Sequence, residues 1–460
     1  MLENHHGKEY IMRRTDIVVI GGSAAGATAA ITARRHYPDK EVYVVRLEKQ
    51  VLIPCGIPYI FGTLGSPAKN IIPDALLEKE GVKIAVETVK AIDPARQTIC
   101  TSEGEIGYQR LILATGSLPA HLPIPGAEKD GNFPIFKEIS KLETLQKRLQ
   151  SAANVVVIGG GFIGIEFADE INKLGGKTVT ILEIAPHCLS LAYDDEFCVE
   201  MENMLKSRGV NIRTNVKVAE IVGDNQVQSV RLNDGTVIPA EIVIFGVGAV
   251  PNVELAKEAG LKLGPTGSVA VDRTMKTSND FIFACGDCAE KISFFGGRPS
   301  SLRLASVATL EARMAGANLY GIRREHDGTV GVWSTAVGNF ALGTAGLTEA
   351  AAKRAGYEFV VACVEGPNRH PGAMPGGAPM KAKLLYERNT GVILGGQLRG
   401  NESIGELINT ISACIQKQMT AEDIAMFQTG THPALTASPI AYHLVNAAEI
   451  AVGQMRKMRT

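Results

Sequence analysis

Cys55 is the residue of this chain best suited to nucleophilic chemistry. It lies in the segment 55–59, which reads CGIPY, and Pro58 suits the first turn of a helix. We therefore expect Cys55 at a helix N-terminus, where the helix field favours the thiolate and lowers the pKa of the thiol. A thiolate attacks a disulfide or a sulfane sulfur. The alternative is a buried structural cysteine, which is the commonest fate of a free Cys.

Residues 159–164 form a glycine-rich turn, GGGFIG, that fits the pattern GxGxxG. The turn follows the apolar run 155–158 and opens the helical stretch 165–174, which is the context that a dinucleotide-binding turn requires. Its glycines let the backbone approach a pyrophosphate, and the helix N-terminus supplies amide donors and partial positive charge. Simple close packing of a strand on a helix is the alternative. The residues that we expect against the nucleotide are Gly159, Gly161, Phe162, Ile163 and Gly164.

Glu183 follows the strand predicted at 178–182 and sets the choice of nucleotide. A carboxylate at this place accepts hydrogen bonds from the adenine ribose 2′-hydroxyl and repels a 2′-phosphate. The sequence therefore predicts NADH in preference to NADPH.

A looser copy of the turn occupies residues 21–26, GGSAAG, after the apolar run 17–20. Ser23 replaces the middle glycine, and the position that matches Glu183 in spacing is Arg46 rather than an acid. Glu48 lies two residues further on and is the candidate substitute for the missing acid. The expected cofactor contacts of this segment are Gly21, Gly22, Ala24, Ala25, Gly26, Arg46 and Glu48.

The composition limits the class of protein. A chain of 460 residues corresponds to about three domains at roughly 150 residues each. Lys and Arg number 47 and Asp and Glu number 48, so a net charge of −1 gives no reason to expect a nucleic-acid or membrane-surface partner. With 45% apolar and 21% charged residues the chain is that of an ordinary globular protein, which excludes wholesale disorder.

The sequence shows no signals for membrane insertion or secretion. No apolar run approaches the roughly 18 residues of a transmembrane helix, and residues 1–14 hold no apolar core of a secretory signal. The eight Cys are scattered along a long chain, which favours free thiols in a reducing, cytoplasmic compartment over a disulfide scaffold.

Short β-branched runs alternate with helical stretches along most of the chain, in two strand–helix–strand units that begin near Gly21 and Gly159. This alternation predicts two doubly wound α/β domains with parallel sheets. Strands are expected at 17–20, 41–45, 111–114, 155–158, 178–182, 242–245 and 281–284, and helices at 27–36 and 165–174.

The pattern changes after about residue 328 and predicts an α+β module without low-complexity segments. Its elements are expected within 330–342, as strands at 359–364 and 382–386, and as helices at 348–355, 403–418 and 420–427.

Several segments taken together resemble one family. They are the turn 21–26, the segments 53–59 (IPCGIPY) and 113–117 (LATGS), the turn 159–164 followed by Glu166, and the segment 283–289 (FACGDCA). Over nearly its whole length the chain resembles the FAD-dependent pyridine nucleotide–disulfide oxidoreductases, in the branch with one redox cysteine. That branch includes coenzyme A disulfide reductases, NADH oxidases and NADH-dependent persulfide or polysulfide reductases.

The resemblance implies FAD on a first domain, NADH on an inserted second domain and a C-terminal domain that forms a homodimer. It implies that Cys55 is the single redox cysteine beside the flavin and that Glu166 lies near the nicotinamide or flavin ring. The expected domain ranges are 1–150 and 271–328 for FAD, 151–270 for NAD and 329–460 for dimerisation. The further cofactor contacts that it implies are Thr115, Gly116, Gly248, Gly286 and Asp287.

The dithiol branch of the family carries a second Cys five residues after the first. That position is Ile60, so an internal disulfide of this kind with Cys55 is excluded, and the substrate sulfur must pair with Cys55 itself. Cys285 and Cys288 form a nominal CxxC, but no second pair and no nearby His complete a metal site. We expect no metal, and the resemblance assigns this turn to flavin binding.

The segment 431–436, THPALT, resembles the His-Pro segment of the dithiol reductases, in which the His protonates a leaving thiolate across the dimer. His432 is therefore the first candidate for proton donor, since a histidine exchanges protons near neutral pH. The Glu that usually orients this His would fall at Ala437. His370 is the second candidate, and a capping or surface role is the alternative for both.

The sequence thus predicts an FAD-dependent NADH oxidoreductase that reduces a disulfide, persulfide or polysulfide through Cys55. Coenzyme A stays open as the thiol: residues 51–54 depart from the coenzyme A enzymes, while Arg34 and Arg35 are candidate phosphate ligands. NADH peroxidases and water-forming oxidases carry a His at the position of Ala24, so peroxide chemistry is the lesser expectation. The rivals are an NADH oxidase or flavin reductase that does not use Cys55, and an NADH-sensing flavoprotein without turnover.

Overall fold

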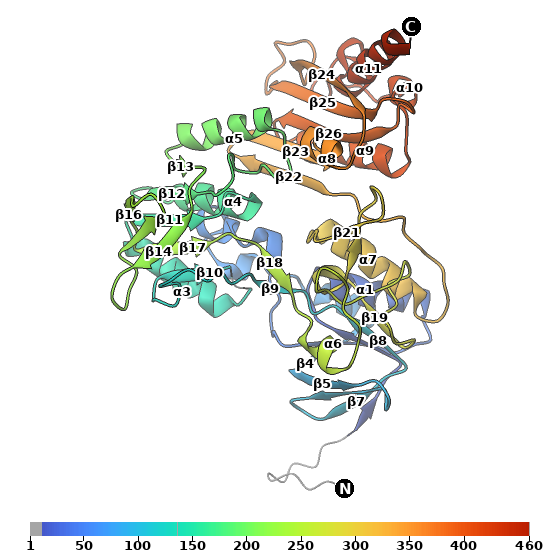
Figure 1. The fold of residues 1–460 in the computed structure, drawn as a ribbon. Coiled ribbons are helices and arrows are strands. Elements are labelled where there is room, and N and C mark those ends of the chain that lie inside the picture. Colours follow the sequence, from blue (N-terminus) through green and yellow to red (C-terminus); the bar gives the residue numbers. More distant parts are fainter. Residues whose placement is uncertain (1–11, 136, 460) are drawn as a thin grey trace.

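The computed structural model describes residues 12–135 and 137–459. Residues 1–11, which belong to the segment expected to hold no secretory signal, lie outside the described residues. Figure 1 shows three lobes: an N-terminal lobe that also carries α7, a second lobe around α4, and a C-terminal lobe around β25. Within the described ranges, no helix is both long and apolar enough to cross a membrane.

The N-terminal lobe is built on a parallel sheet of five strands in the order β19-β8-β2-β3-β4. The strands are β2 (Ile17–Ile20), β3 (Val42–Arg46), β4 (Lys83–Val86), β8 (Arg110–Leu113) and β19 (Ile282–Ala284). β2 is apolar and buried throughout, as a strand inside a covered parallel sheet must be. Because β19 pairs with β8, the chain leaves this sheet for the second lobe and then returns to it.

Two helices, α1 (Ala24–His36) and α7 (Ala305–Asn318), pack against each other in this lobe. α1 begins three residues before the predicted start, because Ser23 is the last extended residue and the helix follows the glycine turn directly. The smaller elements of the lobe are α2 (Ala75–Lys79), α6 (Glu254–Glu258), β20 (Lys291–Ile292), β21 (Pro299–Ser300), and a sheet of β1 (Arg13–Arg14), β5 (Val89–Asp93), β6 (Thr98–Thr101) and β7 (Glu105–Gly107).

The second lobe repeats the plan with a parallel sheet in the order β10-β17-β11-β12-β13. α4 starts at Phe162, because Gly161 is the last extended residue of the turn. The strands of this parallel sheet are β10 (Asn132–Pro134), β11 (Asn154–Ile158), β12 (Thr178–Leu182), β13 (Asn211–Arg213) and β17 (Ile242–Phe245). The lobe also holds an antiparallel sheet of β14 (Val218–Val222), β15 (Ser229–Leu232) and β16 (Val237–Pro239). The helices are α3 (Ile139–Ser151), α4 (Phe162–Asn172) and α5 (Asp195–Ser207).

The C-terminal lobe is an antiparallel sheet in the order β22-β23-β26-β25-β24 with helices packed against it. The strands are β22 (Val332–Val337), β23 (Phe340–Gly346), β24 (Phe359–Pro367), β25 (Pro379–Glu387) and β26 (Ile393–Gly400). The helices are α8 (Glu349–Arg354), α9 (Ile404–Gln416), α10 (Ala421–Ala425) and α11 (His443–Arg459). Two parallel α/β lobes and an α+β lobe confirm the predicted fold class.

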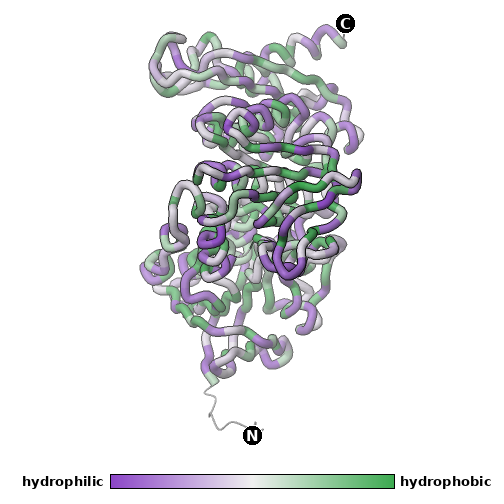
Figure 2. The backbone as a smooth tube through the Cα atoms, turned by 90° about the vertical axis from the view of Figure 1, so that its left-hand side faces the viewer, coloured by the Kyte–Doolittle hydropathy of each residue, from purple (hydrophilic) through white to green (hydrophobic). Residues whose placement is uncertain are grey.

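The second and C-terminal lobes share one apolar core. Val337 and Leu342 of the C-terminal sheet are fully buried among side chains of the second lobe, and Phe162 stacks on Trp333 at 6.1 Å between ring centroids. Figure 2 shows the apolar segments running through the interior and hydrophilic segments at many outer turns. A short antiparallel pair, β9 (Ser117–Pro119) with β18 (Ala249–Pro251), links the N-terminal and second lobes.

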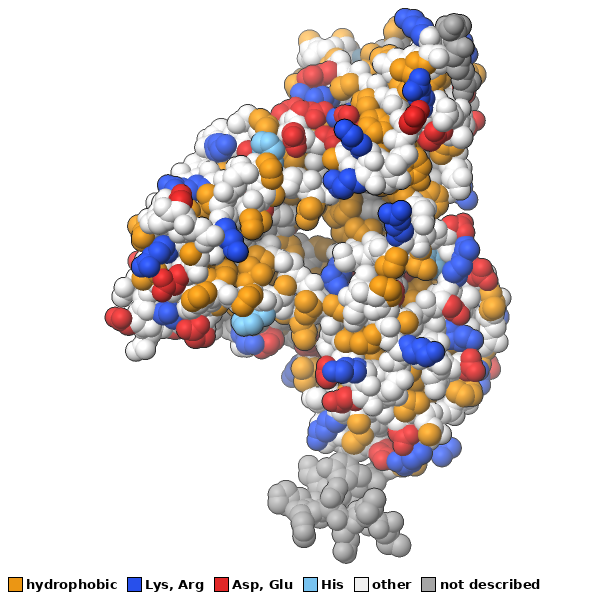
Figure 3. Space-filling view, in the orientation of Figure 1, with side chains coloured by type: hydrophobic (Ala, Val, Ile, Leu, Met, Phe, Trp, Pro, Cys, Tyr) orange, Lys and Arg blue, Asp and Glu red, His pale blue; other side chains and the backbone are white. Residues whose placement is uncertain are grey.

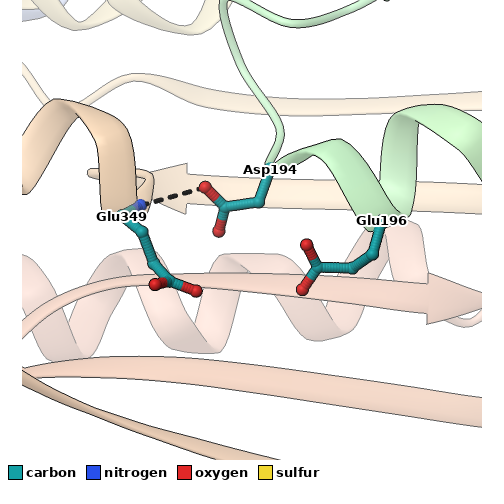
Figure 4. Close-up of side chains that lie close together, drawn as sticks. All are labelled: Asp194, Glu196 and Glu349. Atoms are coloured by element: carbon teal, nitrogen blue, oxygen red, sulfur yellow. Dashed lines mark hydrogen bonds between the residues drawn. The ribbon is translucent and has the colours of Figure 1, made fainter.

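A buried lysine strengthens the contact between the second and C-terminal lobes. Figure 4 shows Asp194, Glu196 and Glu349 close together, with the Glu349 amide donating to Asp194. The Nζ of Lys383 lies 2.9, 2.6 and 2.5 Å from carboxylate oxygens of these three residues. An ammonium group thus stands where a cation bound by the three acids would have to be, so we assign the cluster to lobe packing.

Candidate active site

Cys55 lies in a single 3₁₀ turn, Pro54–Gly56, and not at the start of an α-helix. Pro54, rather than Pro58, occupies the first turn, and a π-helical turn, Ile60–Leu64, follows. Cys55 is exposed and free. Asn70 holds the segment in place: its Nδ2 donates to the Ile53 carbonyl at 2.9 Å, and its side chain fills the space beside Gly56.

The expectation that the helix field lowers the pKa of Cys55 is wrong for the groups of this chain. Although the side chain is exposed, the protein atoms around its sulfur desolvate it in part, which raises the pKa of Cys55, and the negative charges of Glu166 and Asp287 raise it further. The Cys55 backbone and Lys137 act in the opposite direction and do not outweigh them. One turn of 3₁₀-helix carries too small a dipole to offset two carboxylates. Because the charges of Glu166 and Asp287 act on the Cys55 thiol, the three side chains belong to one site.

Glu166 lies on α4, one turn into the helix that starts at the second glycine turn. Its Oε1 accepts a hydrogen bond from the Thr335 hydroxyl at 3.0 Å, so the C-terminal lobe contributes a group to the site. Burial raises the pKa of Glu166 to about 7, and the hydrogen bond from Thr335 opposes this rise. The carboxyl group is therefore poised to bind or release a proton near neutral pH. Burial and the negative charge of Glu166 raise the pKa of the neighbouring Tyr59 to about 12.

Replacing Glu166 with glutamine should make Cys55 more reactive at neutral pH. Cys55 titrates above the pH at which Glu166 loses its proton, so the glutamate is charged where the thiol ionises, and Glu166→Gln removes that charge. We expect the pH profile of Cys55 alkylation to move to lower pH, with an alkylation rate at neutral pH about three-fold higher or more. Glu170→Gln, one turn along the same helix, is the matched control and should change the profile less. A profile that does not move in Glu166→Gln would contradict the assigned contact.

The first glycine turn forms a cradle at the carboxyl end of β2. Gly21 has φ +111°, and a Cβ there would overlap the Ala114 carbonyl oxygen; a Cβ at Gly26 would overlap the Gly21 carbonyl. Across the turn, Gly286 lies against Ala25. These close approaches leave the backbone amides at the start of α1 open to a pyrophosphate, so the residues fit the FAD that the sequence predicts.

Asp287 and the segment Thr115–Gly116 meet beside this cradle. Asp287 Oδ2 accepts a hydrogen bond from the Ser117 hydroxyl at 2.7 Å, and Lys137 Nζ lies 3.3 Å from the same hydroxyl. Thr115 donates its hydroxyl to the Asn252 carbonyl at 2.7 Å, which joins this loop to the second lobe. Ser117 and Lys137 were not singled out by the sequence analysis, because their contacts depend on how distant segments meet.

Arg46 lies against the first glycine turn as an ion-paired, buried residue. It is 3% exposed, and its guanidinium forms two bonds to the Asp74 carboxylate at 2.6 and 2.7 Å. Its Cδ is packed so closely on Gly22 that a Cβ there would lie 2.6 Å away. Its Nε has no partner among the described residues. Glu48 is exposed on the loop that follows. At the position where an acid that contacts the ribose was sought in the sequence, the structure therefore has the ion pair of Arg46 with Asp74.

The second glycine turn is closed by the acid predicted to select the nucleotide. Glu183 Oε2 accepts the Gly160 amide at 2.5 Å, and Oε1 accepts the Ala185 amide at 2.7 Å. Phe162 and Ile163 open α4 beside this turn, and Ile163 is exposed. Gly248 lies in the link to β18, where its carbonyl accepts the Ala120 amide at 3.0 Å. The turn, Glu183 and the helix start therefore meet at one edge of the sheet, as a dinucleotide site requires.

The remaining cysteines near the sites are buried. Cys285 precedes the turn Gly286–Cys288 and Cys288 is its last residue; both are 0% exposed, and burial raises the pKa of both thiols. Cys198 lies in α5, and Cys188 lies in a turn before α5. Burial also raises the pKa of Cys198 to about 12. These thiols are buried whereas Cys55 is exposed, so Cys55 is the thiol of this region that a substrate can reach.

His432 and His370 lie on two loops of the C-terminal lobe that contact each other. The His370 amide donates to the Pro433 carbonyl at 3.2 Å, and His370 Nδ1 lies 3.0 Å from the Thr436 carbonyl oxygen. His432 Nδ1 accepts the Ala434 amide at 3.2 Å, so this bond does not use Nε2. His432 is exposed, whereas Ala437, at the position of the usual orienting Glu, is buried.

Figure 3 shows a hollow on one face of the molecule where the three lobes meet, with hydrophobic side chains along its border. Cys55 and Asp287 come from the N-terminal lobe, Glu166 from the second and Thr335 from the C-terminal lobe. The site is thus assembled from all three lobes.

The sequence matches the family described as pyridine nucleotide-disulphide oxidoreductase over residues 15–312, and the dimerisation domain of the same family over residues 332–440. The chain belongs to this family. Membership confirms the resemblance found in the sequence, and its cofactors are FAD and a pyridine nucleotide. The C-terminal lobe is a dimerisation domain.

Relatives cover nearly the whole chain. It is 32% identical to the NAD(P)H coenzyme A polysulfide/persulfide reductase of Pyrococcus horikoshii, over 88% of this chain and 92% of that one. It is 30% identical to an NADH oxidase of Methanocaldococcus jannaschii, over 89% and 92% of the two chains. The NAD-dependent persulfide reductase from A. fulgidus superposes with a TM-score of 0.89 at 31% identity, over 96% of this chain and 84% of that one.

Proposed function

We propose that this chain is an FAD-dependent NADH oxidoreductase that reduces a disulfide, persulfide or polysulfide through Cys55. The observation that carries the proposal is a single exposed cysteine in a site with Glu166 and Asp287, with Ile60 where a dithiol enzyme would carry its second cysteine. The names of the relatives from Pyrococcus and A. fulgidus support the same class of acceptor. The name of the M. jannaschii relative supports the alternative, an NADH oxidase.

The residues divide the work between three tasks. The turn 159–164 and Glu183 bind NADH and orient it, while the turns at 21–26 and 286–287 hold FAD. FAD, when bound, supplies the electron transfer between the nucleotide and the sulfur substrate. The Cys55 thiolate attacks the substrate sulfur, so that one S–S bond forms as another breaks and a thiolate or hydrosulfide leaves. Over a cycle NADH, one proton and one S–S bond are converted to NAD⁺ and two thiol groups.

We propose that the required proton comes through His432 of the partner subunit in a homodimer. His432 is exposed on the dimerisation domain, and its loop is braced by the His370 loop. Both features suit a group that must reach a site on another chain.

We extend the same proposal to the domain ranges, to the preference for NADH and to a cytoplasmic location, where all eight cysteines would remain reduced. Coenzyme A derivatives belong to the acceptors under test. Within this chain the arginines expected to meet its phosphates already have partners: Arg34 donates to backbone carbonyls, and Arg35 pairs with Glu80.

An acceptor panel under anaerobic conditions tests the function. The FAD-loaded enzyme should oxidise NADH rapidly with at least one of three kinds of acceptor, which are inorganic polysulfide, a persulfide of coenzyme A or glutathione, and the disulfide of either thiol, and slowly without an acceptor. Air should add only a minor rate. If the rate in air without any sulfur compound equals the best rate in the panel, the NADH oxidase alternative is correct. If no acceptor supports turnover, the protein is a sensor and the proposal fails.

Replacing His432 with alanine should slow reduction of the sulfur acceptor by about a hundred-fold, the usual contribution of a general acid. Reduction of the bound flavin by NADH, which does not need this proton, should be unchanged. His370→Ala is the comparison, and it should have the smaller effect because it removes only the side-chain contact with the Thr436 carbonyl and leaves the backbone bond from the His370 amide to Pro433 in place. An undiminished rate of acceptor reduction in His432→Ala would remove this residue from the mechanism.

A further inference from the structure

Two buried charges lie directly beneath the turn Gly286–Cys288. Glu311, on α7, is 0% exposed, and Lys291 is 2% exposed. Glu311 Oε2 accepts the Gly286 amide at 2.9 Å. Lys291 Nζ donates to the carbonyls of Gly286 and Ala289 at 2.6 and 3.0 Å and lies 3.3 Å from the same Oε2. The carboxylate thus holds the N–H of Gly286 while the ammonium holds its C=O.

Burial of these two groups in their charged forms costs free energy, and the packing of the lobe alone does not require it. Burying a carboxylate and an ammonium costs several kcal/mol per ion before their attraction is counted, and apolar residues of similar size would pack at least as well. Glu311 Oε1 also has no partner among the described residues, so the pair is not fully satisfied. The buried residues one turn before and after Glu311 on α7 are otherwise apolar: Val307, Ala308, Met314 and Ala315.

The turn that the pair holds is the one that carries Asp287. Gly286 has φ +78° and leaves no room for a Cβ, which would lie 2.8 Å from Ala25 at the start of α1. The position of Gly286 therefore sets both the approach of the turn to the first glycine turn and the place of Asp287, which is bonded to Ser117. A shift of the Gly286 peptide would move both.

We propose that Glu311 and Lys291 are positioning residues for FAD: by fixing both polar groups of Gly286 they hold Asp287 and the turn in the geometry that retains the cofactor. This inference rests on the proposed placement of FAD against Gly286 and Asp287. Neither residue needs to touch FAD.

The rate at which the purified holoenzyme releases FAD tests the inference. Free FAD is followed by its fluorescence after dilution, at a temperature well below unfolding of each variant. Glu311→Ala should release FAD about ten-fold faster or more, the loss expected for a hydrogen bond to a charged group. Lys291→Met should act in the same direction. Glu311→Gln, which keeps an acceptor for the Gly286 amide, should release FAD faster than the wild type and more slowly than Glu311→Ala. If Glu311→Ala does not fold, Glu311→Gln and Lys291→Met provide the test.

Glu202→Ala is the matched control. Glu202 is also a buried carboxylate on a helix, it accepts the Cys188 amide at 2.9 Å, and it pairs with Lys206, but it lies in the second lobe. Its loss should lower the thermal unfolding midpoint without faster FAD release. If Glu311→Ala and Glu311→Gln lower only the midpoint, as Glu202→Ala does, the pair is merely structural and the inference is overturned.

Asp287→Ala separates this failure from that of the proposed function. If Asp287→Ala also leaves FAD release unchanged, the placement of FAD against this turn is wrong. If Asp287→Ala speeds release while the Glu311 and Lys291 variants do not, the placement stands and only the positioning role is wrong.

Discussion

A Cys55→Ser variant is expected to lose nearly all sulfur reductase activity, with kcat/KM for the acceptor lower by about a thousand-fold or more. A serine hydroxyl is not ionised at neutral pH and forms no bond to sulfur that the flavin can reduce. NADH should still reduce the bound flavin at a similar rate, because the turn 159–164 and Glu183 are untouched. Stopped-flow flavin absorbance and steady-state acceptor reduction measure the two steps separately.

Cys100→Ser is the control for this experiment. Cys100 is also free and exposed, but it lies on β6 in the small sheet of the N-terminal lobe. It should retain full activity in both steps. Full acceptor reduction by Cys55→Ser would instead favour a flavin reductase that transfers electrons without a thiol, and the proposed function would fall.

The second large effect is expected at Glu183. Glu183→Ala removes the carboxylate at the end of β12 and with it the proposed repulsion of a 2′-phosphate. The ratio of kcat/KM for NADH to that for NADPH should fall by about ten-fold to a hundred-fold, the range for hydrogen bonds to a charged group. Part of this loss would come from the turn itself, because Glu183 holds the Gly160 amide at 2.5 Å.

Glu183→Gln separates the two causes. Glutamine has one acceptor oxygen and can keep the bond from the Gly160 amide, although not the bond from the Ala185 amide as well. It carries no charge, so the turn should keep more of its shape than in Glu183→Ala while NADPH becomes a better substrate. If the wild type, Glu183→Ala and Glu183→Gln all show the same ratio of NADH to NADPH activity, Glu183 does not recognise the 2′ position of the ribose.

The elements that local sequence determines were predictable. β2 is an apolar run before glycine, as is β11 after Asn154, and each helix that follows begins at the fourth residue of the glycine-rich segment. The predicted starts of α1 and α4 are each three residues too late, because both helices begin directly after the last extended residue of the turn. The candidate residues Gly21, Glu183 and Asp287 lie at the carboxyl ends of parallel strands, where such sites are expected.

The features that depend on contacts between distant segments were not predictable. The bond from Thr335 to Glu166 joins two lobes, and the pair Arg46–Asp74 joins β3 to a loop before α2. The direction of the Cys55 pKa shift was predicted wrongly, because the pattern indicated a helix start and showed neither the desolvation of the thiol nor the carboxylates that fold beside it. Such effects follow from tertiary structure, which no local motif of one sequence reports.

The most direct test of the account is a mass measurement on Cys55. The oxidised holoenzyme is mixed with polysulfide without NADH under anaerobic conditions, and its peptides are then mapped. We expect sulfur atoms added to the peptide that contains Cys55, and their loss within one turnover after NADH is supplied. Turnover of polysulfide by an enzyme whose Cys55 stays unmodified throughout would contradict the claim that substrate sulfur is reduced while bonded to this residue.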